Sequence, residues 1–332
     1  MGVRFSCFSK RLFFGRLARY DRIQDCYSRN ERVASLKVRT RWGRKRKKKL
    51  ILPNIKIEDA GVQLTGHFAN QKIKEIFEGK EFAEVCFRDF KLIDLAAAHE
   101  IEKSPKIHSL AISSKVTRPA LSKLMQVPGL IDVLVSEFVG CGRLRDFAKG
   151  ADVESFRNYY ALRNADFIQI ADLPKLQTLT AHCAEFGPKA VQKLSSVETL
   201  KVVDFEGVRF TDEMAKALSK SETITDVGLP ATQLSRVGLK SISEMGQLRY
   251  LDIWANGFTA EDLDLLADHP SLEQIELGGF GGDSERQLKA CDVIPKLERL
   301  PALKTVYFEN VVCTDEEIQY LSRRYSFRLL QG

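Results

Sequence analysis

The sequence predicts an α/β solenoid, a curved stack of short repeats with a parallel sheet on the concave side and helices on the convex side. Apolar residues recur in one fixed frame at a period of roughly 24 residues. Within most periods a short, strand-like alternation is followed by a helical apolar pattern. One such unit cannot bury its own apolar face, so neighbouring units must stack on it.

The clearest unit is LRYLDIWANGFTAEDLDLLADHPS, residues 248–271. Its frame positions one, four, six and nine are Leu248, Leu251, Ile253 and Asn256. A strand with period two turns Leu251 and Ile253 to the same face, which we expect to be the core. A turn at Asn256 and a helix beginning near Thr259 complete the predicted unit.

The same frame extends along most of the chain. The predicted first frame positions are Phe82, Ile107, Leu130, Val153, Leu176, Val197, Ile224, Leu248, Leu272 and Leu303. We therefore expect a solenoid of about ten repeats over residues 82–332. Residues 51–81 are expected to form an N-terminal cap, with an extended piece near Ile55 and a helix carrying Ile73 and Phe77. Residues 1–50 would form a separate arm.

The chain resembles the leucine-rich repeat family over roughly residues 80–325, because the frame of Leu248–Asn256 reads L-x-x-L-x-L-x-x-N. The T-D-E-x-x-x-x-L stretches after Thr211 and Thr314 resemble the helical variety common in bacteria and in the cysteine-containing class. Asn256 alone holds the family's residue at position nine. The resemblance implies a solenoid that recognises proteins on its concave face.

Charge is divided unequally along the chain. The net charge of the whole sequence is +7. Residues 1–50 hold 17 Lys or Arg and 3 acids, a net of +14, so the remainder carries −7. A strongly basic arm therefore precedes a mildly acidic body.

The basic arm has four interpretations that the sequence leaves open. The first is a solvated tail, as its composition suggests. The second is a mitochondrial transit segment over residues 1–20, which combine Arg and Phe and contain no acid. The third is a nuclear localisation signal or nucleic-acid contact at Arg44, Lys45, Arg46, Lys47, Lys48 and Lys49, since clustered cations attract phosphate. The fourth is N-terminal lipidation at Gly2.

Cysteine usage and hydropathy favour an intracellular protein. The 7 cysteines are scattered, with no C-x-x-C pair, which disfavours a disulfide framework or structural zinc. Apolar runs stay well below the roughly 18 residues of a membrane-spanning helix. We expect a cytoplasmic location, with a mitochondrial location as the alternative, and no transmembrane segment.

The sequence carries none of the common catalytic signatures. It lacks H-E-x-x-H, G-x-S-x-G, the phosphate-binding P-loop and G-x-G-x-x-G. The 5 histidines fall in different repeats without metal-ligand spacing. We therefore expect no catalytic, metal or cofactor site.

The residues between the frame positions face outward on the concave sheet. Position five reads Cys86, Ala111, Leu134, Arg157, Thr180, Lys201, Gly228, Asp252, Glu276 and Tyr307. In the C-terminal half the outward residues become aromatic and acidic. The predicted partner-binding residues are Tyr250, Asp252, Trp254, Glu273, Glu276, Tyr307 and Glu309. Exposed Trp and Tyr are the residue types that anchor protein interfaces.

Two functional hypotheses follow. The first is a non-catalytic scaffold or adaptor that binds a protein partner, with basic or mixed-charge groups, on the concave face. The alternative is a ribonucleoprotein or mitochondrial assembly component whose basic arm contacts nucleic acid while the solenoid contacts protein.

Overall fold

The structure of the protein is a computed structural model. It describes residues 54–58, 61–66, 70–78, 81–88, 92–103, 106–139, 147–148, 151–159, 162–279 and 287–330. All of them belong to the second of two units into which the chain divides, Pro53–Gln331. The first unit comprises Met1–Leu52 with Gly332. The basic run Arg44–Lys49 therefore lies outside the described residues.

One sheet of 13 strands, joined in chain order, forms the spine of this unit. The first two strands are antiparallel, and from the second strand onward every neighbouring pair is parallel. The strands are β1 Asn54–Glu58, β2 Gly61–Thr65, β3 Glu84–Arg88, β4 Ser109–Thr117, β5 Asp132–Val139, β6 Ser155–Asn158, β7 Thr178–Ala181, β8 Val202–Asp204, β9 Asp226–Gly228, β10 Tyr250–Asp252, β11 Gln274–Gly278, β12 Thr305–Glu309 and β13 Ser326–Leu330.

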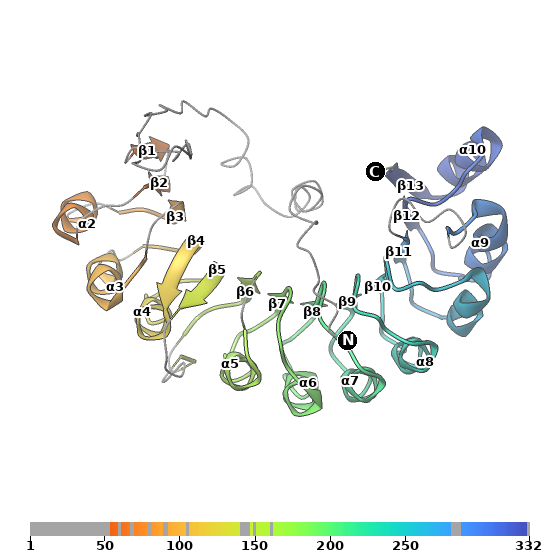
Figure 1. Ribbon diagram of the computed structural model, residues 1–332, viewed down its shortest axis with the longest axis horizontal. Helices are drawn as coiled ribbons and strands as arrows, with labels where there is room; N and C mark the ends of the chain where they lie inside the picture. The colour runs from red at the N-terminus through yellow and green to blue at the C-terminus, as the bar shows by residue number, and fades with distance from the viewer. Residues whose placement is uncertain are drawn as a thin grey trace, which may run out of the picture. The chain divides into compact units, whose positions relative to one another are not determined.

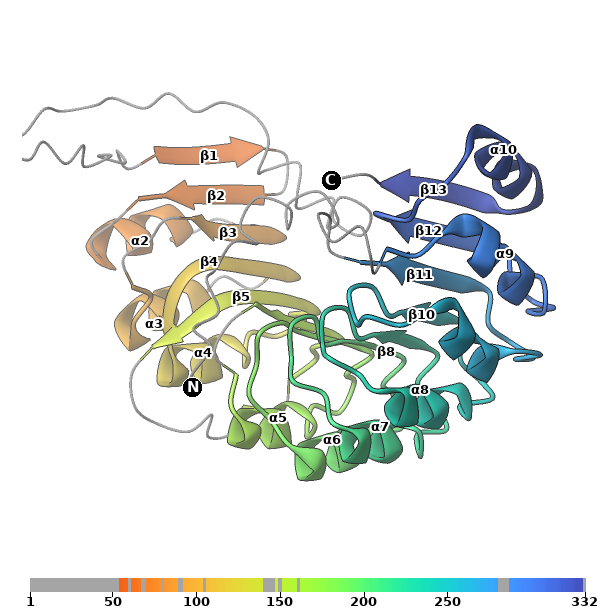
Figure 2. The ribbon, with the colours of Figure 1, turned by 45° about the vertical axis from the view of Figure 1, so that its right-hand side comes forward.

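From β2 onward a helix precedes each following strand, except between β5 and β6, where the described residues contain no helix. The helices are α2 Asn70–Phe77, α3 Leu95–Glu102, α4 Arg118–Leu124, α5 Asn164–Ile170, α6 Pro188–Ser195, α7 Asp212–Leu218, α8 Arg236–Ser243, the 3-10 helix η4 Ala260–Leu266, α9 Ala290–Leu297 and α10 Asp315–Arg324. Within this unit the strands line the inner side of an arc and the helices its outer side (Figures 1 and 2). The predicted α/β solenoid, with a parallel concave sheet and convex helices, is confirmed.

The predicted helix starts are found where threonine caps them. Thr211 accepts a hydrogen bond from the Met214 amide, and Thr314 exchanges hydrogen bonds with Glu317 in a capping box. Thr259 precedes a 3-10 helix rather than an α-helix, and its amide donates to Asp262. These caps satisfy backbone groups that a helix end leaves without partners.

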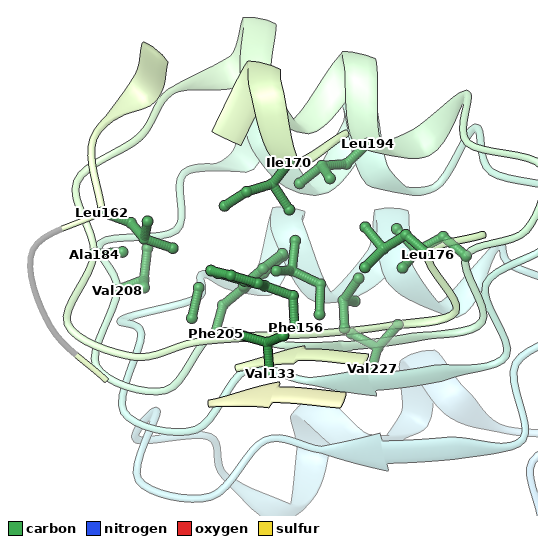
Figure 3. Packing of buried hydrophobic residues seen from close by; sticks show 14 of the residues in the cluster. Val133, Phe156, Leu162, Ile170, Leu176, Ala184, Leu194, Phe205, Val208 and Val227 are labelled. Atoms are coloured by element: carbon green, nitrogen blue, oxygen red, sulfur yellow. The ribbon is translucent and has the colours of Figure 1, made fainter. Parts of the chain in front are cut away.

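The core fills the space between the sheet and the helices. In Figure 3, Ile170 and Leu194 from the helical side face Val133, Phe156 and Val227 from the sheet. All five side chains are completely buried. At roughly 25 cal/mol per Å² of apolar surface removed from water, this continuous layer dominates the stability of the stack.

The N-terminal end is built differently from the rest. β1 and β2 form an antiparallel hairpin, and α2 follows with Ile73 and Phe77 buried. The sequence predicted the extended piece and the helix but not β2, which already pairs with β3 in the parallel array. Ile57 of β1 faces the same side as Val62 of β2 yet remains 54% exposed.

A buried ion pair joins the helical side of two repeats in the N-terminal half. Arg118 at the start of α4 donates to Asp166 of α5 through Nε (3.1 Å) and Nη2 (2.8 Å). The two side chains are 3% and 5% exposed. Asp166 also accepts from the Arg163 amide, so its carboxylate is held from two directions.

One predicted repeat frame is wrong by three residues. The frame from Val197 makes Lys201 the outward residue at position five. In the structure Val203 pairs with Leu179 and with Val227, which makes Leu200 the first frame position and Asp204 the fifth. The neighbouring first positions Leu176, Leu200 and Ile224 are then evenly spaced. Leu200 and Val203 are completely buried, whereas Lys201 is exposed.

Five of the six repeats of β7–β12 have a residue in the left-handed conformation at position eight. These residues are Cys183 (48°), Gly207 (67°), Ala231 (53°), Ala255 (57°) and Asn310 (56°). In the β11 repeat the positive φ falls instead on Gly278 at position seven (141°). This conformation turns the chain toward the helical side. Alongside it, Asn256 at position nine accepts from the amides of Thr232 and Leu234 and donates to the Leu229 carbonyl (2.7 Å). Asn256, which alone holds the family's residue at position nine, thus joins the turns of two neighbouring repeats.

Candidate partner-binding surface

The concave face is an ordered grid, because parallel pairing without register shifts aligns equivalent residues from β6 through β13. Positions three, five and seven of each repeat point away from the helices. Neighbouring strands lie roughly 4.8 Å apart, so one column of residues crosses the whole face. We call the part carried by β8–β12 the acidic face.

The acidic face is defined by its carboxylates. At positions three, five and seven of β8–β12 they are Asp204, Glu206, Asp226, Asp252, Glu276 and Glu309. The same positions, all of which the structure describes, hold no Lys or Arg. Like charges in one concave region reinforce one another and attract cations.

Tyr250 and Glu276 form the centre of this surface. The Tyr250 hydroxyl donates to Glu276 Oε1 at 3.0 Å. Burial, followed by the nearby Asp252 and Glu276 carboxylates, raises the pKa of Tyr250 well above its ordinary value of 10.0. The phenol therefore keeps its proton at neutral pH and holds the Glu276 carboxylate in place.

Tyr307 and Glu309 continue the surface onto β12. Tyr307 is the direct neighbour of Glu276 in the register, and Glu309 is the neighbour of Gly278. Tyr307 is half-buried, while Glu309 is 9% exposed. A Cβ at Gly278 would lie 1.9 Å from the Glu309 carbonyl oxygen, so only glycine permits this approach of the two strands.

Trp254 was predicted to be exposed, and this prediction is wrong. The side chain is 8% exposed, and Asp252, which accepts from the Trp254 amide at 2.9 Å, is 6% exposed. Position seven of the two adjacent repeats holds Pro230 and Gly278, neither of which has a long side chain. The Ala231 amide donates to the Trp254 carbonyl, and the Ala255 amide donates to the Gly278 carbonyl.

Glu273 lies outside the concave columns. It precedes β11 by one residue, at position two, where Arg249 and Lys304 of the adjacent repeats pair with it at 3.1 and 3.3 Å. Hydrogen bonds from Arg249 and then Lys304 lower the pKa of Glu273. This exposed row joins repeats at the start of their strands and does not extend the acidic face.

The sequence analysis did not identify His182, a buried histidine that lies beside two carboxylates at the N-terminal border of the acidic face. His182 is 3% exposed, with Nε2 at 3.1 Å from Asp204 and Nδ1 at 3.9 Å from Glu206. The Tyr159 ring lies 5.1 Å from the imidazole. Burial lowers the pKa of His182, but attraction to Asp204 and Glu206 outweighs it and the pKa is raised. The correct frame at β8 would have placed both acids beside His182.

Among the described residues, no group of three His, Cys, Asp or Glu is arranged to hold a metal ion. Within the described residues, no helix has both the length and the apolar character needed to span a membrane. The acidic face is the candidate functional surface of the described residues.

Comparisons with known proteins add little to this description. No protein-family model matches the chain, and no curated protein matches its sequence. Among solved structures, the chain is similar to an internalin (inlF) from Listeria monocytogenes, with 10% sequence identity and a TM-score of 0.44. That similarity covers 82% of this chain and 79% of the internalin. The fold assignment rests on the strand register and the helices of the chain itself.

Proposed function

We propose that the protein is a non-catalytic recognition scaffold of the leucine-rich repeat family, which binds a protein partner on the acidic face. The observation that carries the proposal is the adjacency of Tyr250, Glu276 and Tyr307 on three neighbouring strands. Two aromatic rings and a positioned carboxylate lie together on a sheet whose opposite side is completely buried.

Such a surface has the physical properties of a recognition site. Aromatic side chains bury much area while losing few rotatable bonds, and they are enriched among the residues that dominate binding energy. The parallel register fixes the relative positions of the side chains before a partner arrives. A preorganised surface loses less conformational entropy on binding than a flexible one.

The test is affinity capture with the full chain, comparing the native sequence with the double variant Tyr307→Ala/Glu276→Gln. The matched control is Tyr320→Ala/Glu298→Gln, which likewise removes one tyrosine ring and one glutamate charge, but on the outer side, where Tyr320 of α10 donates to Glu298. We expect a saturable protein partner to be retained by the control and lost from the concave variant. Equal retention by both variants would refute binding at the acidic face.

A second candidate is favoured by the separation of charge along the chain. The basic run Arg44–Lys49 is suited to phosphate, so we also propose nucleic-acid contact by the arm in an intracellular assembly. Phosphate binding releases counterions, and its affinity is expected to fall by orders of magnitude between low and moderate salt. Electrophoretic shift of RNA by the full chain, with and without Ser substitutions throughout the run, measures this.

A further inference from the structure

We propose that the partner segment recognised by the acidic face is an extended, cationic stretch of polypeptide rich in Arg. This inference rests on the proposed function and names the chemistry of the partner. The first half of the same sheet provides the internal comparison. At positions three, five and seven of β2–β7, the carboxylates Glu84 and Asp132 are balanced by Arg88 and Arg157.

The carboxylates of the acidic face are spaced to meet an extended chain that crosses the strands. Five strands span roughly 19 Å at 4.8 Å per step, which about six residues of extended chain cover at 3.3 Å each. Alternate side chains of such a segment point to the same side, about 6.6 Å apart. A segment with a cation at every second residue would therefore present about three cations to the carboxylates of the acidic face.

The structure holds several of these carboxylates in fixed orientations. Glu276 accepts from the Tyr250 hydroxyl, and Asp252 accepts from the Trp254 amide. Gly228 leaves position five of β9 without a side chain, and a Cβ there would lie 3.1 Å from Asp204 Oδ1. One oxygen of the Asp204 carboxylate thus lies against β9, while the other is 3.1 Å from His182 Nε2. Orientation before binding is what makes a charge pair selective.

Aromatic rings between the acids favour arginine over lysine. Tyr250 and Tyr307 lie on the strands on either side of Glu276. A guanidinium can stack on a ring while it donates two hydrogen bonds to a carboxylate, whereas an ammonium is a compact point charge. The composition of the face therefore matches arginine in both its charge and its planar shape.

Other classes of partner fit this surface less well. Nucleic acid and acidic peptides would meet repulsion from the same carboxylates. An apolar helix requires an exposed apolar patch, and the large exposed apolar side chains of the described residues lie elsewhere. They are Ile55, Ile57, Leu92, Leu95, Ile131, Val237, Val312, Tyr320 and Leu330. Of these, only Leu330 occupies a concave column, and it belongs to β13.

The experiment uses fluorescence anisotropy with a labelled peptide of about twelve residues that alternates Arg and Ser, long enough to cross the face. A Glu–Ser peptide of the same length is the charge control. Each is titrated with the full chain and with a full chain in which Arg44–Lys49 are replaced by Ser. The second form removes the chain's own cationic run as a competitor.

Two matched double variants locate the binding. Asp226→Asn/Glu276→Gln removes two charges from the acidic face, on the strands flanking β10. Glu222→Gln/Glu244→Gln removes the same number from exposed positions near α7 and α8. We expect the first to weaken Arg–Ser binding by roughly five- to tenfold and the second by less than about twofold. Urea unfolding of both variants checks that neither change acts through stability.

Each outcome decides the proposal. Binding that appears only after the basic run is neutralised still supports it, and identifies that run as a competing occupant. An equal loss in both double variants, equal binding of the Glu–Ser peptide, or no saturable binding to either full chain would overturn it. If protein capture depends on Tyr307 and Glu276 while the peptide shows no such dependence, the scaffold function stands and the cationic partner does not.

Discussion

The two halves of the concave sheet, β2–β7 and the acidic face, share one interior and differ on the surface. Leu110 on β4 and Leu251 on β10 occupy the same frame position, and both are essentially fully buried. The charged residues at the outward positions are balanced in sign in the first half and are all acidic in the second. The buried frame is common to both halves, so the difference in outward charge is what distinguishes them as binding surfaces.

The halves also differ in regularity. β4 and β5 are longer than the later strands, and their pairing shifts register between Ile112 and Lys115. From β6 onward the pairing keeps one register. The irregular half contains the buried Arg118–Asp166 pair, and the regular half contains Asn256 with its turn hydrogen bonds. Different polar interactions therefore join the repeats in the two halves.

The largest expected effect comes from the irregular half. Arg118→Ala should destabilise the protein by about 3–5 kcal/mol, because Asp166 would stay buried without its cation. Chemical denaturation followed by circular dichroism measures the loss. The double variant Arg118→Met/Asp166→Leu removes both charges and should recover most of the stability. If the double variant were as unstable as Arg118→Ala, loss of packing rather than an uncompensated charge would be the cause.

Because the two halves of the sheet have equivalent interiors, equivalent core substitutions should destabilise the protein by similar amounts. Leu110→Ala and Leu251→Ala should each lower the free energy of unfolding by about 2–5 kcal/mol, as truncation in a packed core does. Urea unfolding of the two variants in parallel measures this. A loss below about 0.5 kcal/mol, typical of surface substitutions, at either site would show that its frame position is not a core position.

A smaller effect is expected at the turn of the β10 repeat. Asn256→Ala removes hydrogen bonds to the backbone of two repeats and should cost about 1–3 kcal/mol. Hydrogen exchange would locate the loss at Thr232 and Leu234, whose amides lose their acceptor. Unchanged protection of those amides would contradict the proposed bridge between repeats.

The smallest effect is a pH dependence at the border between the halves. The pKa of His182 is raised above its ordinary value of 6.5, so the folded state binds the proton more tightly than the unfolded state. The resulting stability is fully present below about pH 6.5 and is lost as pH rises through the folded pKa. His182→Gln should therefore destabilise the protein more at about pH 5.5 than at about pH 8, as urea titrations at the two values would measure. If His182→Gln lowered the free energy of unfolding equally at the two pH values, protonation of His182 would not be linked to stability.

The fold class was predictable because burial of the repeated frame leaves a periodic trace in the sequence. The error at β8 has a physical origin, since Val197, Leu200 and Val202 satisfy the apolar one-four-six pattern as well as Leu200, Val203 and Phe205 do. Only pairing with the adjacent strands selects the second frame. β13 was missed because the first frame position of its repeat is Arg324, which is charged and breaks the apolar pattern.

The candidate surface was only partly predictable, since side-chain exposure depends on lateral neighbours. Alternation correctly placed Tyr250, Glu276 and Tyr307 on the concave sheet, but it could not reveal that Trp254 is buried. The importance of His182 was hidden for a related reason. Its partners Asp204 and Glu206 lie more than 20 residues away along the chain and become neighbours only through the register.

The unbroken register has a consequence for how such a surface can change. Residues 224–247 form one complete period that begins at a first frame position and ends just before the next. Excising this segment would place β8 beside β10 and bring Asp204 next to Asp252, while the buried residues would meet equivalent partners. Duplicating it would widen the face by one strand. The recognition surface can therefore evolve by gain or loss of whole modules, a larger step than point substitution that leaves the interior unchanged.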